Sequence, residues 1–125
     1  GSLFASSIES SAHINFKNAI IDAKEGDTQL LLRKLSPTRL LKGGFYDKIK
    51  EAEDRGATKD ELLEIIGVGK TKKGMFEGNL EEGELEIGQV SSVINEVLSV
   101  KYIFSKLKKE YSIALNKTDN LIKTL

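Results

Sequence analysis

Apolar residues recur every three or four positions along most of the chain, which is the spacing of one face of an α-helix. This pattern, with its start and stop signals, predicts helices at about residues 11–24, 36–43, 45–55, 58–66, 87–97 and 99–111. Ser10 or Ser11 can cap the first of them, and Ser99 can cap the last. Thr58 and Glu61 have the spacing of a capping box. The chain is therefore expected to be mainly α-helical.

Two segments depart from the helical pattern. Residues 2–6 predict a short strand, and Thr28–Leu32 is either a strand or an extended arm. A lone strand cannot form a sheet, because its backbone groups need a neighbouring strand. The first strand is therefore expected to belong to a larger sheet, of which this chain is a piece. Residues 67–88 are rich in glycine and charge, and they predict a loop.

The composition excludes several classes of function. The 125 residues carry 19 basic and 19 acidic side chains, so no net charge favours binding to nucleic acid or to an anionic membrane. With no cysteine and a single histidine, the sequence predicts no thiolate chemistry and no zinc site. No stretch approaches the ~18 apolar residues of a membrane span. These features together predict a cytoplasmic protein of one domain.

A glycine-rich segment, Gly67-Val-Gly-Lys-Thr71, superficially resembles a phosphate-binding P-loop. The P-loop pattern needs a further glycine where this chain has Glu64, and it should follow a strand, whereas this segment follows a predicted helix. We therefore interpret it as the end of a helix followed by a basic loop.

Neither the acidic residues nor the histidine predicts a site. Residues 77–86 contain five glutamates, but they lack the alternating Asp/Asn spacing of a calcium loop and are interpreted as a solvated acidic loop. His13 has no candidate catalytic partner nearby and is interpreted as a packing or capping residue.

Two blocks of sequence, in this order, resemble a family of flavin enzymes. The first consists of GSLF at residues 1–4, ESSAHINFK at 9–17 and AKEGDT at 23–28, and it is similar to the family's last barrel unit. The second, KGMFEGNLEEGELEIGQV at residues 73–90, is similar to the family's C-terminal signature. The family comprises the nitronate monooxygenases, formerly 2-nitropropane dioxygenases, and the flavin-dependent enoyl-acyl-carrier-protein reductases of fatty acid biosynthesis.

The resemblance implies an α/β fold: this chain would be the C-terminal part of an FMN-binding (β/α)8 TIM barrel, itself mainly helical with one or two short strands. Residues 1–27 would be the last barrel strand and helix, 28–79 an inserted helical segment with a glycine-rich loop, and 80–125 the C-terminal helices. The partners implied are the remainder of the barrel and, as an open alternative, a second copy of the chain.

The resemblance also implies which residues bind the cofactor. Backbone amides and a small side chain at Gly1 and Ser2 suit a phosphate, and the family holds the FMN phosphate at this position. The cofactor-binding residues implied are Gly1, Ser2, Leu3, Phe4, Gly88 and Gln89. The usual family pattern at residues 1–4 is Gly-Thr-Arg-Phe, so Leu3 replaces an arginine. The family's catalytic histidine would lie before residue 1, and the resemblance matches His13 to a structural histidine instead.

The function implied is that of an FMN-dependent oxidoreductase that, when whole, uses NAD(P)H to reduce an enoyl thioester. The first alternative is oxidation of alkyl nitronates, and nothing in these residues separates the two substrates. The second alternative is a non-catalytic helical module that binds a partner through its C-terminal helices. The isolated chain is expected to be inactive, because one βα unit cannot enclose a flavin ring.

Overall fold

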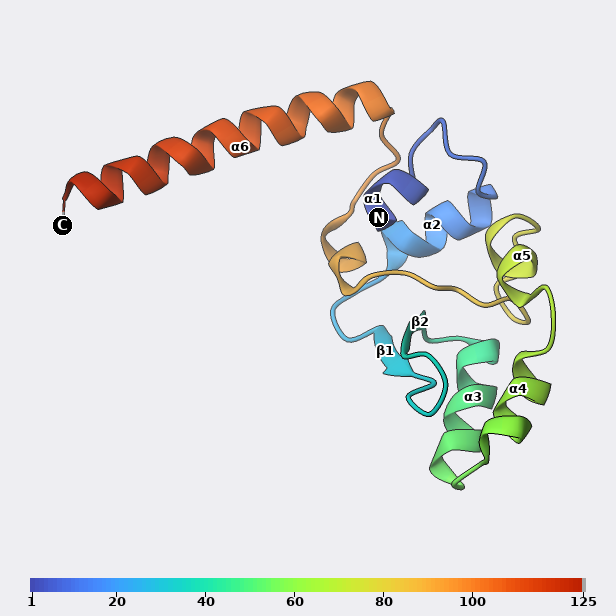
Figure 1. Cartoon of the computed structure of the whole chain (residues 1–125). Coiled ribbons are helices and arrows are strands. Elements are labelled where there is room, and N and C mark those ends of the chain that lie inside the picture. Colours follow the sequence, from blue (N-terminus) through green and yellow to red (C-terminus); the bar gives the residue numbers. More distant parts are fainter. Residues whose placement is uncertain (125) are drawn as a thin grey trace.

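The computed structural model describes residues 1–124, which form a mostly helical structure with one two-stranded antiparallel sheet (Figure 1). In chain order the elements are α1 (Ser2–Ala5), α2 (Ile14–Asp22), β1 (Thr28–Leu31), β2 (Thr38–Leu41), α3 (Gly44–Asp54), α4 (Lys59–Ile66), α5 (Lys70–Met75), the 3-10 helix η1 (Gln89–Val93) and α6 (Val100–Lys123).

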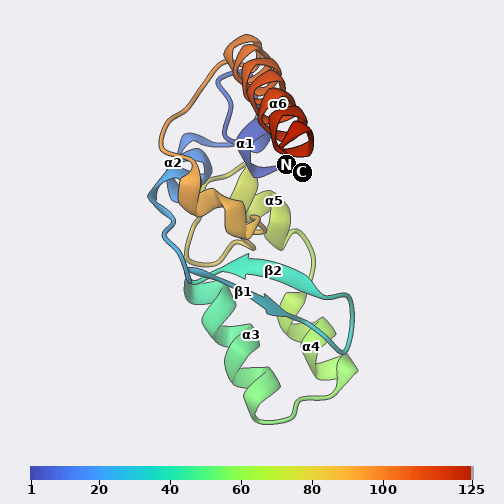
Figure 2. The ribbon, with the colours of Figure 1, turned by 90° about the vertical axis from the view of Figure 1, so that its left-hand side faces the viewer.

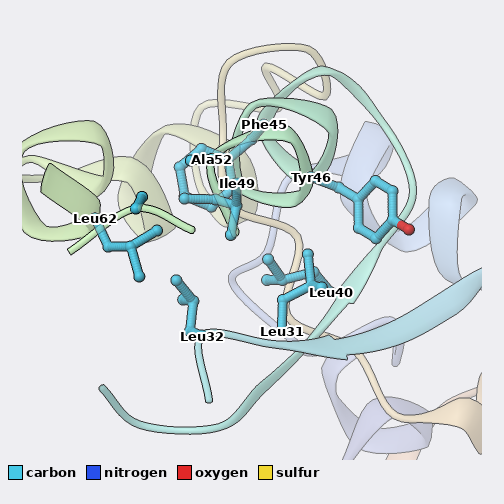
Figure 3. Packing of buried hydrophobic residues seen from close by; sticks show 9 residues of the cluster. Leu31, Leu32, Leu40, Phe45, Tyr46, Ile49, Ala52 and Leu62 are labelled. Atoms are coloured by element: carbon cyan, nitrogen blue, oxygen red, sulfur yellow. The ribbon is translucent and has the colours of Figure 1, made fainter. Parts of the chain in front are cut away.

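The sheet and the helices α3 and α4 enclose one hydrophobic core. β1 and β2 pair so that Thr28 lies opposite Leu41 and Leu31 opposite Thr38. Side chains from the strands meet the inner faces of both helices (Figure 3). The buried members of this first core are Leu31, Leu32, Leu40, Phe45, Tyr46, Ile49, Ala52, Ala57 and Leu62.

A second hydrophobic core lies on the other side of the sheet, where Figure 2 shows α1, α2 and α5. Its buried members are Ala12, Phe16, Ile20, Ala23, Leu85, Ile87 and Ile94. Successive residues of a strand point to opposite faces, so neighbouring residues of β2 contact different cores. Leu40 is buried in the first core, whereas Leu41 packs against the second. The sheet therefore separates the two cores.

The segment after α5 runs along the free edge of β2. Leu40 and Glu86 form an isolated antiparallel bridge, and the amide of Leu41 donates to the carbonyl of Leu85 at 2.9 Å. The antiparallel register then sets Arg39 opposite Ile87, the residue before Gly88. β2 is thus paired on both edges.

The predicted strand at residues 2–6 is wrong, because Ser2–Ala5 is the short helix α1. The amides of Phe4 and Ala5 both donate to the carbonyl of Gly1, at 3.0 and 2.9 Å. An extended segment would need a neighbouring strand to satisfy the same amides, and none lies beside it in residues 1–124.

The predicted helix at residues 36–43 is also wrong, since Thr38–Leu41 is β2. Pro37 suits the first turn of a helix, but it equally suits the residue before a strand, where no amide is needed. Residues 38–41 form a strand because they pair with β1 on one edge and with Leu85 on the other. The same pairing shows that Thr28–Leu31 is a strand, which was one of the two alternatives.

Two predictions in the second half of the chain need correction. The predicted loop at residues 67–88 contains α5, which begins after Gly69 at a φ of +80°. The helix predicted at 87–97 is reduced to the five residues of η1. Ile87 and Ile94 are buried while Val90 and Val93 are 53% and 68% exposed, so these apolar residues do not share one buried helical face.

The remaining helix predictions are confirmed. α3 and α4 occupy the predicted positions, the capping box of Thr58 and Glu61 is present, and Ser99 caps α6 by accepting from the amide of Tyr102. α2 begins later than predicted. Its cap is His13, whose Nδ1 accepts from the amide of Asn15 at 3.1 Å. The interpretation of His13 as a capping residue is therefore confirmed.

Helix α6 extends away from both cores (Figure 1). Ile103 is its one buried side chain in the described part of the chain. Several large apolar side chains on α6 are instead exposed: Tyr102, Phe104, Leu107, Tyr111, Ile113, Leu115, Leu121 and Ile122. Within residues 1–124, no helix has the length and apolar character needed to cross a bilayer.

The capping box predicts a pH-dependent contribution to stability. The Glu61 carboxylate accepts from the amide of Thr58 at 2.7 Å, and this hydrogen bond lowers the pKa of Glu61 from its ordinary value. Because the folded pKa is the lower one, the stabilisation is complete above the unfolded pKa and is lost as the pH falls through the folded pKa. Urea unfolding of the wild type and Glu61→Gln should therefore differ at neutral pH and converge in acid.

Glu64→Gln is the matched control, since Glu64 is exposed on the same helix and has no capping hydrogen bond in the described structure. Its effect on stability should not follow the pH dependence of Glu61→Gln. Thr58→Ala should lower the free energy of unfolding by about 1 kcal/mol at neutral pH. Equal pH dependence of the two glutamine variants would contradict this assignment.

Candidate functional site

The two segments predicted to bind the cofactor, residues 1–4 and 88–89, meet in the structure. The hydroxyl oxygen of Ser2, which is 8% exposed, accepts from the amide of Gly88 at 2.8 Å. A Cβ added at Gly88 would lie 3.3 Å from that oxygen, a close contact that a small shift of the Ser2 side chain would have to relieve. Residues 86 positions apart in sequence therefore form one site.

The loop after α1 is held in place by buried polar contacts. Ser6 donates its hydroxyl hydrogen to the carbonyl of Leu3 at 3.1 Å. The ammonium group of Lys17, a buried residue of α2, donates to the carbonyls of Ile8 and Ser10 at 3.3 and 2.8 Å. An ammonium group is otherwise costly to bury. These contacts fix the position of α1, and with it the position of Ser2.

The same loop is tied to the start of α6. The amide of Ile8 donates to the carbonyl of Leu98 at 3.0 Å, and the carboxylate of Glu9 accepts from the amide of Val100 at 2.9 Å. A carboxylate near a helix N-terminus is favourable because of the helix dipole. The base of α6 and the candidate site are therefore parts of one hydrogen-bonded unit.

Two surface hollows lie between β2 and the segment 86–93, the first beside α1 and the second beside residues 25–28. The first has a volume of about 410 Å³ and is lined by Gly1, Ser2, Ala5, Arg39, Met75, Glu86, Ile87 and Gly88. The second has a volume of about 600 Å³ and is lined by Glu25, Gly26, Thr28, Arg39, Gln89, Val90, Ser92 and Val93. Arg39 lines both, so the two hollows adjoin at its side chain.

The structure separates the six predicted cofactor-binding residues into three groups. Gly1, Ser2 and Gly88 line the first hollow, and Gln89 lines the second. Leu3 packs against the second core, and the ring of Phe4 lies 5.6 Å from that of Phe104 on α6. Neither Leu3 nor Phe4 lines either hollow.

Arg39 was missed by sequence analysis because a helix was predicted at its position. It is partly buried, and its Nη1 donates to the carbonyl and the hydroxyl of Thr28 at 3.3 and 3.2 Å. The alternation of Arg39, Leu40 and Leu41 was the available signal, since it places a charged residue on the face opposite Leu40. Arginine is well suited to anions because it presents several N–H donors in one plane.

The glycine-rich segment that resembled a P-loop lies outside both hollows. Gly67 ends α4, and the hydroxyl of Thr71 donates to the carboxylate of Glu84 at 2.5 Å. Lys73 forms an ion pair with Glu82, whose pKa is lowered by its hydrogen bond with Lys73. The glutamates of this region thus contact the neighbouring basic segment. No group of three or more potential metal ligands occurs within the described residues.

Comparisons with known proteins identify a structural relative. No family model matches the chain, and no curated protein matches its sequence. FabK from Thermotoga maritima superposes with a TM-score of 0.85 and 32% sequence identity, over 96% of this chain and 38% of that chain. The chain is similar to FabK. A mutant of Thermotoga maritima FabK also matches, with a TM-score of 0.78, 31% identity, and coverage of 96% of this chain and 35% of that chain.

The similarity to FabK includes most of α6. The part of this chain left unmatched is 4% of 125 residues, or about five residues, whereas α6 has 24. Most of α6, the helix that extends away from both cores, therefore has a counterpart in FabK. Because this chain spans 35–38% of the FabK chains, most of each FabK chain has no equivalent here.

Two buried serines, Ser2 in the first hollow and Ser91 in η1, provide a matched test of the hydrogen bond that joins Ser2 to Gly88. Ser2 accepts a hydrogen bond from Gly88, whereas the hydroxyl of Ser91, which is 0% exposed, has no hydrogen-bond partner in residues 1–124. Ser2→Ala should lower the free energy of unfolding by about 1–2 kcal/mol, because it leaves the Gly88 amide without its acceptor. Ser91→Ala should leave stability unchanged or raise it, since it removes an unsatisfied buried hydroxyl.

Urea unfolding of both variants measures this difference, and an NMR spectrum of the Gly88 amide reports the lost hydrogen bond directly. A loss of stability in Ser91→Ala as large as that in Ser2→Ala would contradict the assignment of Ser2 as the residue that joins the two segments.

Proposed function

We propose that this chain is the C-terminal portion of an FMN-dependent oxidoreductase that reduces enoyl thioesters with NAD(P)H. The observation that carries the proposal is the similarity to FabK at 31–32% identity over 96% of the chain. FabK is a flavin-dependent enoyl-acyl-carrier-protein reductase with a TIM-barrel fold. On this proposal the (β/α)8 barrel is completed by polypeptide beyond these 125 residues.

The residues of the first hollow suit the phosphate end of a flavin. Gly1 is the N-cap of the four-residue helix α1, and the hydroxyl of Ser2, which forms no donor hydrogen bond within residues 1–124, is available to donate to a phosphate oxygen. Gly88 brings a second segment of backbone within hydrogen-bond distance of Ser2. We assign Gly1, Ser2 and Gly88 to the flavin phosphate and Gln89 to the adjoining part of the flavin. Leu3 and Phe4 support this site by packing against the second core and α6.

When bound, a flavin would supply the hydride transfer between the reduced nicotinamide and the enoyl thioester. The contribution of these 125 residues is to bind and orient the cofactor. His13 caps α2 through its Nδ1, and we assign it a structural role. We place the catalytic groups and the substrate pocket in the remainder of the parent protein.

The apolar face of α6 fits the same proposal. A 24-residue helix with one buried side chain gains little from tertiary packing, which supplies most of the stability of helices in proteins. Most of α6 has a counterpart in FabK. We propose that the remainder of the barrel protein covers this face, which makes that remainder the principal partner of the chain.

A chimera tests the proposal most directly. The segment of Thermotoga maritima FabK that matches this chain is replaced by residues 1–125, and the purified protein is examined for bound flavin and for NAD(P)H oxidation that depends on an enoyl thioester. We expect a flavin-containing chimera with measurable activity, because the replaced parts are similar in structure. FabK lacking the segment is the negative control.

The isolated chain should show no NAD(P)H oxidation with an enoyl thioester or with an alkyl nitronate. A folded chimera without flavin would contradict the proposal that residues 1–125 belong to a flavin enzyme. Turnover by the isolated chain would contradict the assignment of the catalytic groups to the remainder of the parent.

A further inference from the structure

Arg39 is the basic side chain common to both hollows of the candidate site. Its position follows from strand pairing: β2 lies between β1 and the segment that leads to Gly88, with Arg39 opposite Leu30 on one edge and opposite Ile87 on the other. Leu40 turns into the first core, so Arg39 points to the face of the sheet that carries α1 and the second core. The backbone thus brings a guanidinium group beside Ser2 and Gly88.

The guanidinium group is oriented but keeps unused donors. Nη1 is held by the carbonyl and hydroxyl of Thr28. No hydrogen bond is formed by Nε or Nη2 in residues 1–124, and no carboxylate of the described chain is ion-paired with Arg39. Glu86 lines the first hollow and Glu25 the second, and both are exposed. An anchored arginine with free donors is suited to hold an anion, since little side-chain freedom remains to be lost.

The chemistry of the neighbours specifies which anion. The first hollow is lined by Gly1 and by the hydroxyl of Ser2, which accepts from the Gly88 amide and, within residues 1–124, keeps its own hydrogen free to donate. A tetrahedral phosphate with two or three negative oxygens can contact such groups on one side and a guanidinium fork on the other. Leu3 packs against the second core and supplies no charge to the first hollow.

We propose that Arg39 is a phosphate-binding residue that closes the site formed by Gly1, Ser2 and Gly88. This inference rests on the proposed function for the identity of the phosphate, which is the monoester of the flavin. The phosphates of a nicotinamide dinucleotide share the same chemistry, and the experiment separates the two sources. The role of Thr28 is to position the guanidinium group.

The test is an NMR titration of the 125-residue chain, at constant ionic strength, with inorganic phosphate, FMN, riboflavin and NADPH as separate probes. Phosphate and FMN should shift the amides of Ser2 and Gly88 and the side-chain Nε–H of Arg39, whereas riboflavin, which lacks the phosphate, should not. Arg39→Gln should weaken phosphate and FMN binding about tenfold or more, as expected for loss of a charge-assisted hydrogen bond.

Two variants control for folding and for charge. Arg33→Gln removes one positive charge from an exposed position outside both hollows and should leave phosphate affinity unchanged. Arg39→Lys retains the charge without the planar fork, so its affinity should fall between those of the wild type and Arg39→Gln. The dispersion of the amide spectrum shows whether each variant is folded.

Each outcome decides a separate question. Unchanged phosphate affinity in a folded Arg39→Gln variant, or no response of the wild type to phosphate, overturns the role of Arg39. Binding of phosphate and NADPH through Arg39 without a stronger response to FMN supports the phosphate site and contradicts its assignment to the flavin. The chimera tests the proposed function independently, because its flavin content does not depend on the isolated chain binding phosphate.

Discussion

The structure depends on the pairing of β2 along both of its edges. A four-residue strand with one partner has few hydrogen bonds and would be marginal in water. Here β2 is bonded to β1 on one side and to the segment around Leu85 on the other. The alternation along β2 then sends Leu40 into one core and Leu41 towards the other. Arg39, one residue earlier, lies at the candidate site for the same geometric reason.

Features set by neighbouring residues could be predicted from the sequence. The capping box of Thr58 and Glu61 and the cap at Ser99 involve groups within three residues of one another, and both were found where expected. The amphipathic pattern of α3 was also sufficient to predict this helix, because its apolar residues all face one core. The meeting of Ser2 and Gly88 was anticipated only through a family resemblance, since no local pattern relates residues so distant in sequence.

The failures have a common physical cause. Residues 2–5 and 38–41 took the opposite secondary structure from the one predicted, because the presence or absence of a pairing strand outweighed local preference. At residues 87–97, the apolar side chains lie in different environments: two isoleucines are buried and two valines are exposed. Their helical spacing therefore did not reflect one buried helical face. Arg39 could not be placed at a site until β2 was known to be a strand.

The anchoring of α6 at one end alone has a consequence for how the chain unfolds. Its first turn is tied to the body through Ile8, Glu9 and the buried Ile103, whereas the residues beyond are exposed. Backbone hydrogen bonds that are not coupled to a core open locally rather than with the whole molecule. Unless its apolar face is covered, α6 therefore forms a cooperative unit distinct from the two cores. A spectroscopic signal of helix content would then record two transitions, and the free energy of the cores could not be taken from the total helical signal.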